Sequence, residues 1–228
     1  MMSRIRQTLG RARRKLVRIF LRGAERRHSL VGSAKLWAMK RQFQFDFLTN
    51  KGLTKSHFLL DFGCGTLRGG MPLIEYLDIG HYYGVDVRPE VLEEANRELE
   101  EARLVQKKPT LMLSSDSAHL PKGKFDYVWA FSVLIHMDDN NLRRAMSLVK
   151  NCLMPQGFFF ANVNIGNGPE QRWQGFPVVQ RPLEFYKTVA AENAMTAADI
   201  GTLSFLGHNS GVESQDKQHM IQFSHLLE

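Results

Sequence analysis

The sequence predicts an α/β protein built on a mostly parallel β-sheet with helices on both faces. Between residues 57 and 163, short apolar segments alternate with charged amphipathic segments, as strands joined by helical crossovers do. Two later apolar segments, near 199–206 and 218–224, have no helical pattern between them, so we expect them to close the sheet as a hairpin. The 228 residues, 43% of them hydrophobic, suffice for one large domain.

The expected elements follow in chain order. Pro72 is tolerated in the first turn of a helix that begins near Met71, and Asp138 or Asp139 would cap a later helix. Residues 164–180, rich in Gly, Asn and Pro, are expected to form a loop. The five strands before that loop are expected at 57–61, 81–87, 109–116, 124–131 and 157–163. Further helices are expected at 34–49, 88–104, 137–153 and 182–194.

Charge sets the N-terminal segment apart. Residues 1–28 carry ten Lys or Arg and one Glu, a net charge of +9, which leaves −2 for the rest of a chain whose total is +7. Its apolar residues recur at helical spacing, so a basic amphipathic helix is expected over 3–22. The segment would bind an anionic membrane surface, bind nucleic acid, or remain a solvated extension or targeting peptide. Nucleic acid is disfavoured because Phe20 is its only aromatic residue.

A glycine-rich loop carries the strongest functional signal. In "DFGCGTLRGG", Asp61 is followed by Gly63, Gly65 and Gly69, a spacing one residue longer than the dinucleotide fingerprint. Asp86 ends the next strand, where a carboxylate can accept both hydroxyls of a ribose. Asp116 lies just past the third strand, where it could accept from an adenine amino group.

The loop and four later motifs resemble the class I S-adenosylmethionine (SAM)-dependent methyltransferases, over about residues 53–224. The motifs are "YYGVDV", "SSDSAHLP", "FDYVWAFSVLIHM" and "LMPQGFFFANV", and the wording is most similar to a bacterial branch with a generic methyltransferase domain. The resemblance implies a Rossmann-like, seven-stranded sheet with an antiparallel last strand, and SAM as the cofactor. It divides the chain into a basic extension (1–28), a helical lid or cap (29–52) and a methyltransferase domain (53–228).

The resemblance also implies the cofactor-binding residues. Asp61, Gly63 and Gly65 would meet the methionyl part of SAM, and Arg68 would pair with its carboxylate. Asp86 would bind the ribose and Asp116 the adenine edge. The complete expected set is Asp61, Gly63, Gly65, Thr66, Arg68, Asp86, Val87, Asp116, Ser117 and Phe131.

Methyl transfer requires the acceptor and the methyl group to be held together in a dry site. A base is useful where the acceptor must lose a proton, and His136, after the fourth strand, is the candidate catalytic residue; alternatively it braces the next helix. Asn162 and Asn164 would hydrogen-bond a polar acceptor or form turns. The eight histidines show no metal-ligand spacing, so no metal is expected.

The expected function is methyl transfer to an oxygen or nitrogen of a small polar, glycan or lipid-linked acceptor. Two alternatives stay open: methylation of RNA or protein recruited by the basic segment, and a SAM-binding scaffold without transfer. No Asn-Pro-Pro-Tyr-like stretch follows the fourth strand, which disfavours methylation of nucleic-acid bases. Two cysteines and no stretch of about 20 apolar residues favour the cytoplasm, with peripheral attachment at the inner membrane face as an option.

Overall fold

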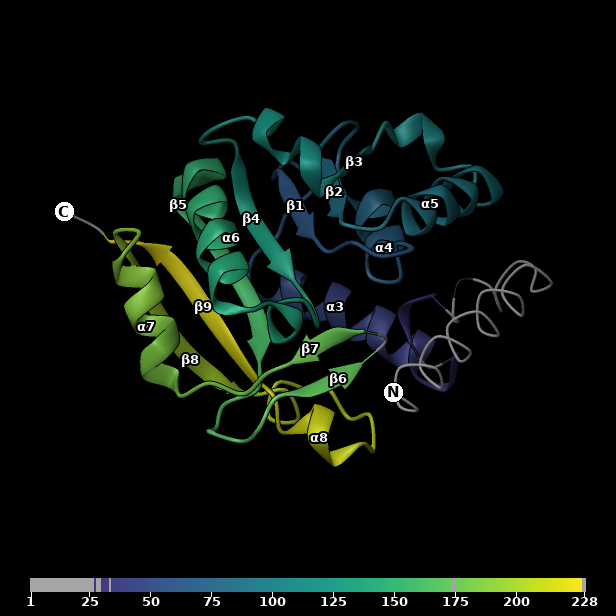
Figure 1. The fold of residues 1–228 in the computed structure, drawn as a ribbon. Helices are drawn as coiled ribbons and strands as arrows, with labels where there is room; N and C mark the ends of the chain where they lie inside the picture. Colours follow the sequence, from purple (N-terminus) through teal and green to yellow (C-terminus); the bar gives the residue numbers. More distant parts are fainter. Residues whose placement is uncertain (1–26, 28–29, 33, 174, 227–228) are drawn as a thin grey trace, which may run out of the picture.

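A seven-stranded sheet forms the centre of the protein, with strand order β3-β2-β1-β4-β5-β9-β8 (Figure 1). The computed structural model describes residues 27, 30–32, 34–173 and 175–226, so the predicted basic helix at 3–22 lies outside the described residues. Strands β1 to β5 run parallel, and β9 is antiparallel to both of its neighbours. The predicted Rossmann-like sheet with an antiparallel last strand is confirmed. Its strands are β1 (Leu59–Phe62), β2 (Tyr82–Asp86), β3 (Thr110–Leu113), β4 (Phe125–Ala130), β5 (Leu153–Val163), β8 (Met195–Thr202) and β9 (His219–His225).

Helices cover both faces of the sheet (Figure 1). Alternate residues of each strand face opposite sides, so Val128 of β4 packs in the core with α6 (Asp139–Cys152) and α7 (Leu183–Ala191). Its neighbour Trp129 packs in the other core, against the second group of helices. This group consists of α3 (Trp37–Asn50), α4 (Gly70–Tyr76) and α5 (Pro89–Glu101).

Local sequence signals explain where two of these helices begin. Asp138 is the N-cap of α6, and its carboxylate accepts the N–H of Asn141 at 2.8 Å. Pro72 lies in the first turn of α4, where its missing N–H costs nothing. None of the helices in the described part of the chain is long and apolar enough to cross a membrane.

Three connections differ from the sequence-based expectation. The expected loop at 164–180 contains a hairpin of β6 (Gln171–Trp173) and β7 (Phe176–Val178). The strand expected at 109–116 ends at Leu113, because residues Ser114–His119 turn into a 3₁₀ helix. Between β8 and β9 a short helix, α8 (Glu213–Asp216), is present where no helix was expected.

The segment expected to be a lid or cap contributes to the core. Phe43, Phe47 and Leu48 of α3 are buried, and Trp129 donates its indole N–H to the amide oxygen of Gln44 at 2.9 Å. A 3₁₀ turn, Ala34–Leu36, precedes the helix. Helix α3 thus covers the sheet beside the glycine loop, and Lys40 and Gln44 line the cavity described next.

Candidate active site

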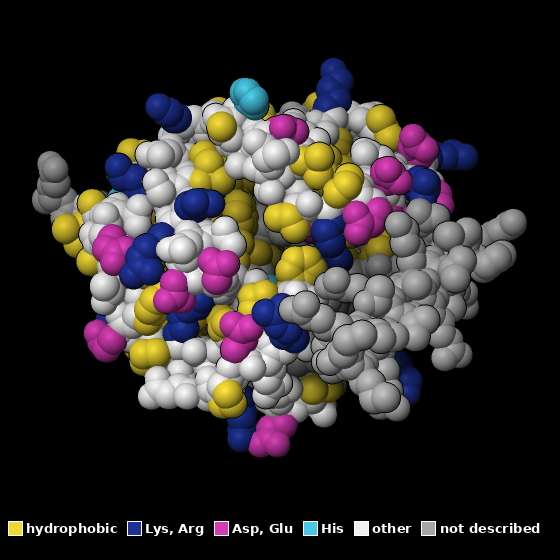
Figure 2. Space-filling view, viewed as in Figure 1, with side chains coloured by type: hydrophobic (Ala, Val, Ile, Leu, Met, Phe, Trp, Pro, Cys, Tyr) yellow, Lys and Arg dark blue, Asp and Glu magenta, His cyan; other side chains and the backbone are white. Residues whose placement is uncertain are grey.

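A cavity of about 1340 Å³ lies at the carboxyl ends of β1, β2 and β4. Hydrophobic side chains surround a hollow near the centre of the face shown in Figure 2. The cavity walls come from the glycine loop, α3, the start of the 3₁₀ helix after β3, the β6–β7 hairpin and α8. Ten of the eleven predicted site residues line it: Asp61, Gly63, Gly65, Thr66, Arg68, Asp86, Val87, Ser117, Phe131 and His136.

The glycine loop brings backbone, without side chains, to the edge of the cavity. Gly63 and Gly65 adopt φ angles of 83° and 60°, which L side chains rarely adopt. A Cβ atom on Gly63 would lie 2.4 Å from a methyl carbon of Val133. The N–H groups of Gly63 and Cys64 both donate to the carbonyl of Val85, at 2.7 and 3.0 Å, so the loop is fixed to the end of β2.

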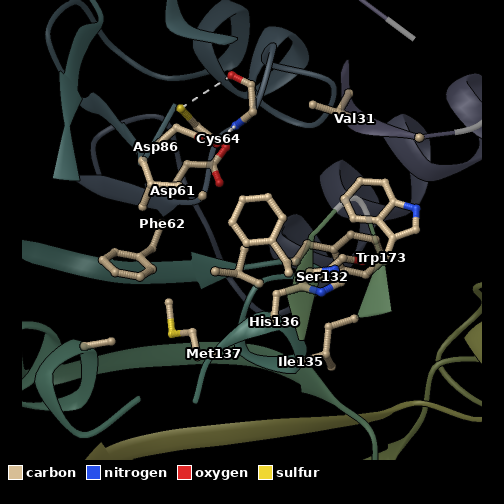
Figure 3. A pocket seen from close by; sticks show the side chains of 18 of the residues that line it. Val31, Asp61, Phe62, Cys64, Asp86, Ser132, Ile135, His136, Met137 and Trp173 are labelled. Atoms are coloured by element: carbon tan, nitrogen blue, oxygen red, sulfur yellow. Dashed lines mark hydrogen bonds between the residues drawn. The ribbon is translucent and has the colours of Figure 1, made fainter. Parts of the chain in front are cut away.

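Asp86 organises the turn at the end of β2. Its Oδ2 accepts the N–H of Gly65 at 3.1 Å, and its Oδ1 accepts the N–H of Arg88 at 3.0 Å. The Arg88 guanidinium lies 3.5 Å from the same carboxylate. Because a carboxylate oxygen can accept two hydrogen bonds, Asp86 retains accepting capacity toward the cavity (Figure 3). This geometry fits the ribose hydroxyls that its position predicts.

Asp61 is a buried carboxyl group beside Asp86 (Figure 3). The Tyr82 hydroxyl donates to its Oδ2 at 2.6 Å. Burial, with a smaller contribution from the negative charge of Asp86, raises the pKa of Asp61 to about 7, against the opposing effects of the Tyr82 hydrogen bond and the Arg68 charge. A cation placed beside Asp61 would restore its ionised form, and the ammonium group of a methionyl moiety is such a cation.

Two side chains at the glycine loop carry buried polar atoms without a hydrogen-bond partner among the described residues, the Thr66 hydroxyl and the Arg68 Nε. Arg68 also donates from Nη1 to the carbonyl of Val31 at 3.1 Å, and burial lowers its pKa to about 10. Unpaired buried polar groups are costly. Both fit a bound ligand with a carboxylate at this end of the cavity, as predicted for the methionyl part of SAM.

At the end of the cavity predicted to bind adenine, one of the predicted residues, Asp116, is missing from the lining. Asp116 is exposed, accepts a hydrogen bond from Ser115 at 3.2 Å, and does not line the cavity. The 3₁₀ helix after β3 turns Asp116 away and presents Ser117 to the cavity instead. The Ser117 hydroxyl donates to the carbonyl of Ser114 at 2.7 Å. Half-exposed Val87 supplies an apolar surface on the same side.

His136 lies opposite the two carboxyl groups, next to Ser132, Ile135 and Trp173 (Figure 3). Its Nδ1 is 2.8 Å from the carbonyl oxygen of Pro177. Since a carbonyl only accepts, Nδ1 carries the proton and the neutral ring keeps a lone pair on Nε2. Burial lowers the pKa of His136, the Pro177 hydrogen bond opposes that shift, and the charge of Arg88 lowers the pKa further. The ring also stacks on Trp173, with centroids 5.4 Å apart.

A chain of amide side chains runs along the far wall of the cavity; the sequence singled out Asn162 and Asn164 but not Gln218, nor the bonds that join the three. Asn162 accepts the N–H of Ser132 at 2.6 Å and donates to Gln218, also at 2.6 Å. Gln218 in turn donates to Asn164 at 3.0 Å. Asn162 is fully buried within β5, so it positions the loop after β4, in which Ser132 has a φ of 60°. Asn162 itself neither forms a turn nor lines the cavity, whereas Asn164 and Gln218 line it.

Comparison with known proteins agrees with this geometry. Residues 60–159 match a family described as a methyltransferase domain, while no curated protein matches the chain. The structure is similar to YcgJ from Bacillus subtilis, with 16% identity and a TM-score of 0.63, over 82% of this chain and 99% of that one.

Two further similar structures bear on the cofactor. The magnesium protoporphyrin IX methyltransferase of Synechocystis, solved with bound S-adenosylhomocysteine (SAH), has 17% identity and a TM-score of 0.62, over 84% of this chain and 85% of that one. The glycopeptide N-methyltransferase MtfA, solved with SAM, has 14% identity and a TM-score of 0.61, over 81% and 93%. Family match over residues 60–159, fold and motifs together support a class I SAM-dependent methyltransferase.

Proposed function

We propose that the enzyme methylates an oxygen or nitrogen atom of a small polar, glycan or lipid-linked acceptor, with His136 orienting or deprotonating that acceptor. The observation that carries this proposal is that one cavity contains both the glycine loop and His136. Pockets for drug-sized ligands commonly measure about 300–1,000 Å³, so 1340 Å³ leaves room for an acceptor beside the cofactor.

The chain's own residues fit SAM at the glycine-loop end. Asp86 would accept from the ribose hydroxyls, Asp61 would face the ammonium group, and Arg68 would use its unpartnered Nε on the carboxylate. When bound, SAM would supply a methyl group on a sulfonium sulfur; the acceptor atom would attack that methyl carbon, and the carbon–sulfur bond would break in line with SAH as the leaving thioether. The protein has to hold the acceptor in that line and exclude water.

His136 suits a general base at neutral pH. Its lowered pKa keeps the ring unprotonated near pH 7, and the Pro177 carbonyl fixes the tautomer with the lone pair on Nε2. As the acceptor atom bonds to the methyl carbon, its proton would pass to Nε2. The Pro177 carbonyl would then stabilise the resulting imidazolium. Trp173 and Phe176 flank the ring, with centroids 5.4 and 6.3 Å away, and limit access of water.

The first experiment is calorimetric titration of the full chain with SAM and, separately, with SAH. We expect binding of both with micromolar dissociation constants; binding of neither would contradict the cofactor assignment. Radiolabelled SAM then serves to screen small phosphorylated, carboxylated, glycan and lipid-linked acceptors. With an acceptor in hand, His136→Ala should lower kcat by roughly 10²–10⁴-fold and leave SAH affinity unchanged.

A matched control for that variant is His119→Ala. His119 is an exposed histidine whose ring contacts the carbonyl of Asp116 and which does not line the cavity, so its loss should leave kcat unchanged. Equal kcat values for His136→Ala and the wild-type protein would reduce His136 to a structural residue bracing the β6–β7 hairpin.

A further inference from the structure

Cationic side chains outnumber carboxylates in the lining of the cavity. Among its described residues the only carboxylates are Asp61 and Asp86, against five cationic side chains: Lys40, Arg68, Arg88, Arg144 and Lys217. Arg88 lies 3.5 Å from Asp86, and Lys217 pairs with Glu213 outside the cavity. The cavity therefore carries more positive charge than its own acids balance.

Two cations in this set, Arg68 and Lys40, have neither an ion pair with a described residue nor full access to water. Arg68 is assigned above to the cofactor carboxylate, which leaves Lys40, in the first turn of α3. No hydrogen bond or ion pair joins its ammonium group to any described residue of the chain, although the side chain is only partly exposed. Burial and the charge of Arg68 lower its pKa to about 8, and Asp216 opposes the shift. An unpaired, partly buried ammonium group is costly to the folded protein.

Asp216 is the acid whose charge acts on the pKa of Lys40, but both of its carboxylate oxygens already accept hydrogen bonds from other residues. Its Oδ1 accepts from the His208 ring at 3.0 Å and from the Ser210 hydroxyl at 2.7 Å. Its Oδ2 accepts the N–H of Gly211 at 3.0 Å. Asp216 thus holds the loop before α8 together and forms no ion pair with Lys40, which lines the cavity.

A second unsatisfied group comes from α8. Gln215 lines the same cavity, and its Oε1 is buried without a hydrogen-bond partner among the described residues. With the side-chain amide in its alternative orientation, Gln215 would present two N–H donors at that position. Lys40 and Gln215 line the same cavity, and the charge of Asp216, the residue after Gln215, acts on Lys40. An ammonium group and an amide on one cavity wall are a donor set for an anion.

We propose that Lys40, assisted by Gln215, binds an anionic group of the methyl acceptor, a carboxylate or a phosphate. This inference rests on the proposed function, because it adds the charge of the acceptor to the same cavity. The anionic group anchors the acceptor against α3 and α8 while another atom of the same molecule faces His136. Charge attraction then selects acids and phosphate esters over cationic amines.

The test is the chemical reactivity of Lys40 in the full chain loaded with SAH. Acetic anhydride, a small neutral reagent, acetylates lysines, and mass spectrometry gives the rate at each site. We expect phenyl phosphate or benzoate, at millimolar concentration, to slow acetylation of Lys40 at least threefold, while choline has no effect. The two anions show whether phosphate or carboxylate is preferred.

Lys124 is the matched internal control. Its ammonium group donates to the Tyr83 hydroxyl at 2.6 Å, and it lies outside the cavity lining, so its acetylation rate should not respond to either anion. Equal protection of both lysines, or no protection of Lys40 by either anion, would overturn the proposal. So would protection of Lys40 by SAH alone, since Lys40 would then hold the cofactor carboxylate.

A substitution separates this proposal from the cofactor assignment. Lys40→Gln should leave SAH affinity within about twofold and abolish the calorimetric response of the SAH-loaded protein to the protecting anion, whereas Lys40→Arg should retain that response. If wild-type protein binds no SAH, the proposed function fails first. If SAH binds and the anion response persists in Lys40→Gln, only the anion site is wrong.

Discussion

The Nδ1 atom of His136 lies 2.8 Å from the carbonyl oxygen of Pro177, and this contact links a ring in the cavity to the β6–β7 hairpin. The backbone N–H of Val179 also donates to the carbonyl of Ile135, at 2.9 Å. Strand β7 and the residue after it are therefore joined by two contacts to the turn that carries His136. It fixes the orientation of the ring as well as its tautomer.

Nitrogen-15 NMR of the histidine rings tests the tautomer without any acceptor. We expect the Nδ1–H form for His136 and a midpoint below pH 6.5, because burial and Arg88 lower its pKa. A lowered pKa means that the free base predominates at neutral pH, so kcat should fall as the solution is acidified toward that midpoint and reach half of its plateau there. An Nε2–H form at pH 7.5 would contradict the assignment of the lone pair.

Asp86→Ala should weaken SAM binding by about 1–3 kcal/mol, the cost of leaving buried donors without an acceptor. The substitution removes the acceptor for the Gly65 N–H as well as the predicted ribose contact. Asp116→Ala is the informative control, because Asp116 does not line the cavity and its loss should leave affinity within about 0.5 kcal/mol. Calorimetry measures both. A large loss in the control would restore Asp116 as an adenine contact.

Asp61→Asn should stabilise the cofactor-free protein at alkaline pH. Burial raises the pKa of Asp61 from 3.8 to about 7, so the folded state is penalised as pH rises from the unfolded value through the folded one. The asparagine carries no charge and can still accept from the Tyr82 hydroxyl. At pH 8 we expect the free energy of unfolding to rise by about 1–2 kcal/mol, with no gain at pH 3.5.

The same substitution should weaken SAM binding, because the asparagine lacks the charge that would face the ammonium group. Urea unfolding at the two pH values, with SAM titration at pH 8, gives both quantities. Unchanged stability at pH 8 would show that the carboxylate of the folded protein is better compensated than its burial indicates.

Asn162→Ala should destabilise the protein by about 2–4 kcal/mol, because it leaves the Ser132 N–H and the Gln218 amide oxygen without their partners. Asn96→Ala is the control: Asn96 is exposed on α5, and among the described residues its side chain donates to the carbonyl of Leu92 alone. Denaturant unfolding compares them. A loss below about 0.5 kcal/mol for Asn162→Ala would show that water replaces the amide.

The sequence was sufficient to predict the parts whose signals are local. Apolar runs that end in Asp61 and Asp86, with glycines between them, identify two neighbouring strands and the loop between β1 and α4. Parallel strands place their carboxyl ends at one edge of the sheet, and the glycine loop, Asp86 and His136 each follow or end such a strand. The order of the strands therefore suffices to predict that they line one cavity.

The features that the sequence did not predict depend on contacts between distant segments. The strands of the β6–β7 hairpin are three residues each, too short to show an alternating pattern. Trp173 lies at the site because the hairpin packs on His136, which no local pattern indicates. Asn162 and Gln218 are 56 residues apart, and no local pattern joins them. Asp116 was misplaced because a strand predicted to residue 116 became a 3₁₀ turn after Leu113.

Arg68 and Arg88 donate to the carbonyls of Val31 and Leu30, at 3.1 and 3.0 Å. Arg68 on the glycine loop and Arg88 beside Asp86 thus also hold the backbone that follows the basic segment of the chain. A cofactor carboxylate bound by Arg68 would therefore be thermodynamically linked to the position of residues 30–32. Any ligand that pulls this backbone away loosens the arginines, and by reciprocity a bound cofactor opposes that ligand by the same free energy.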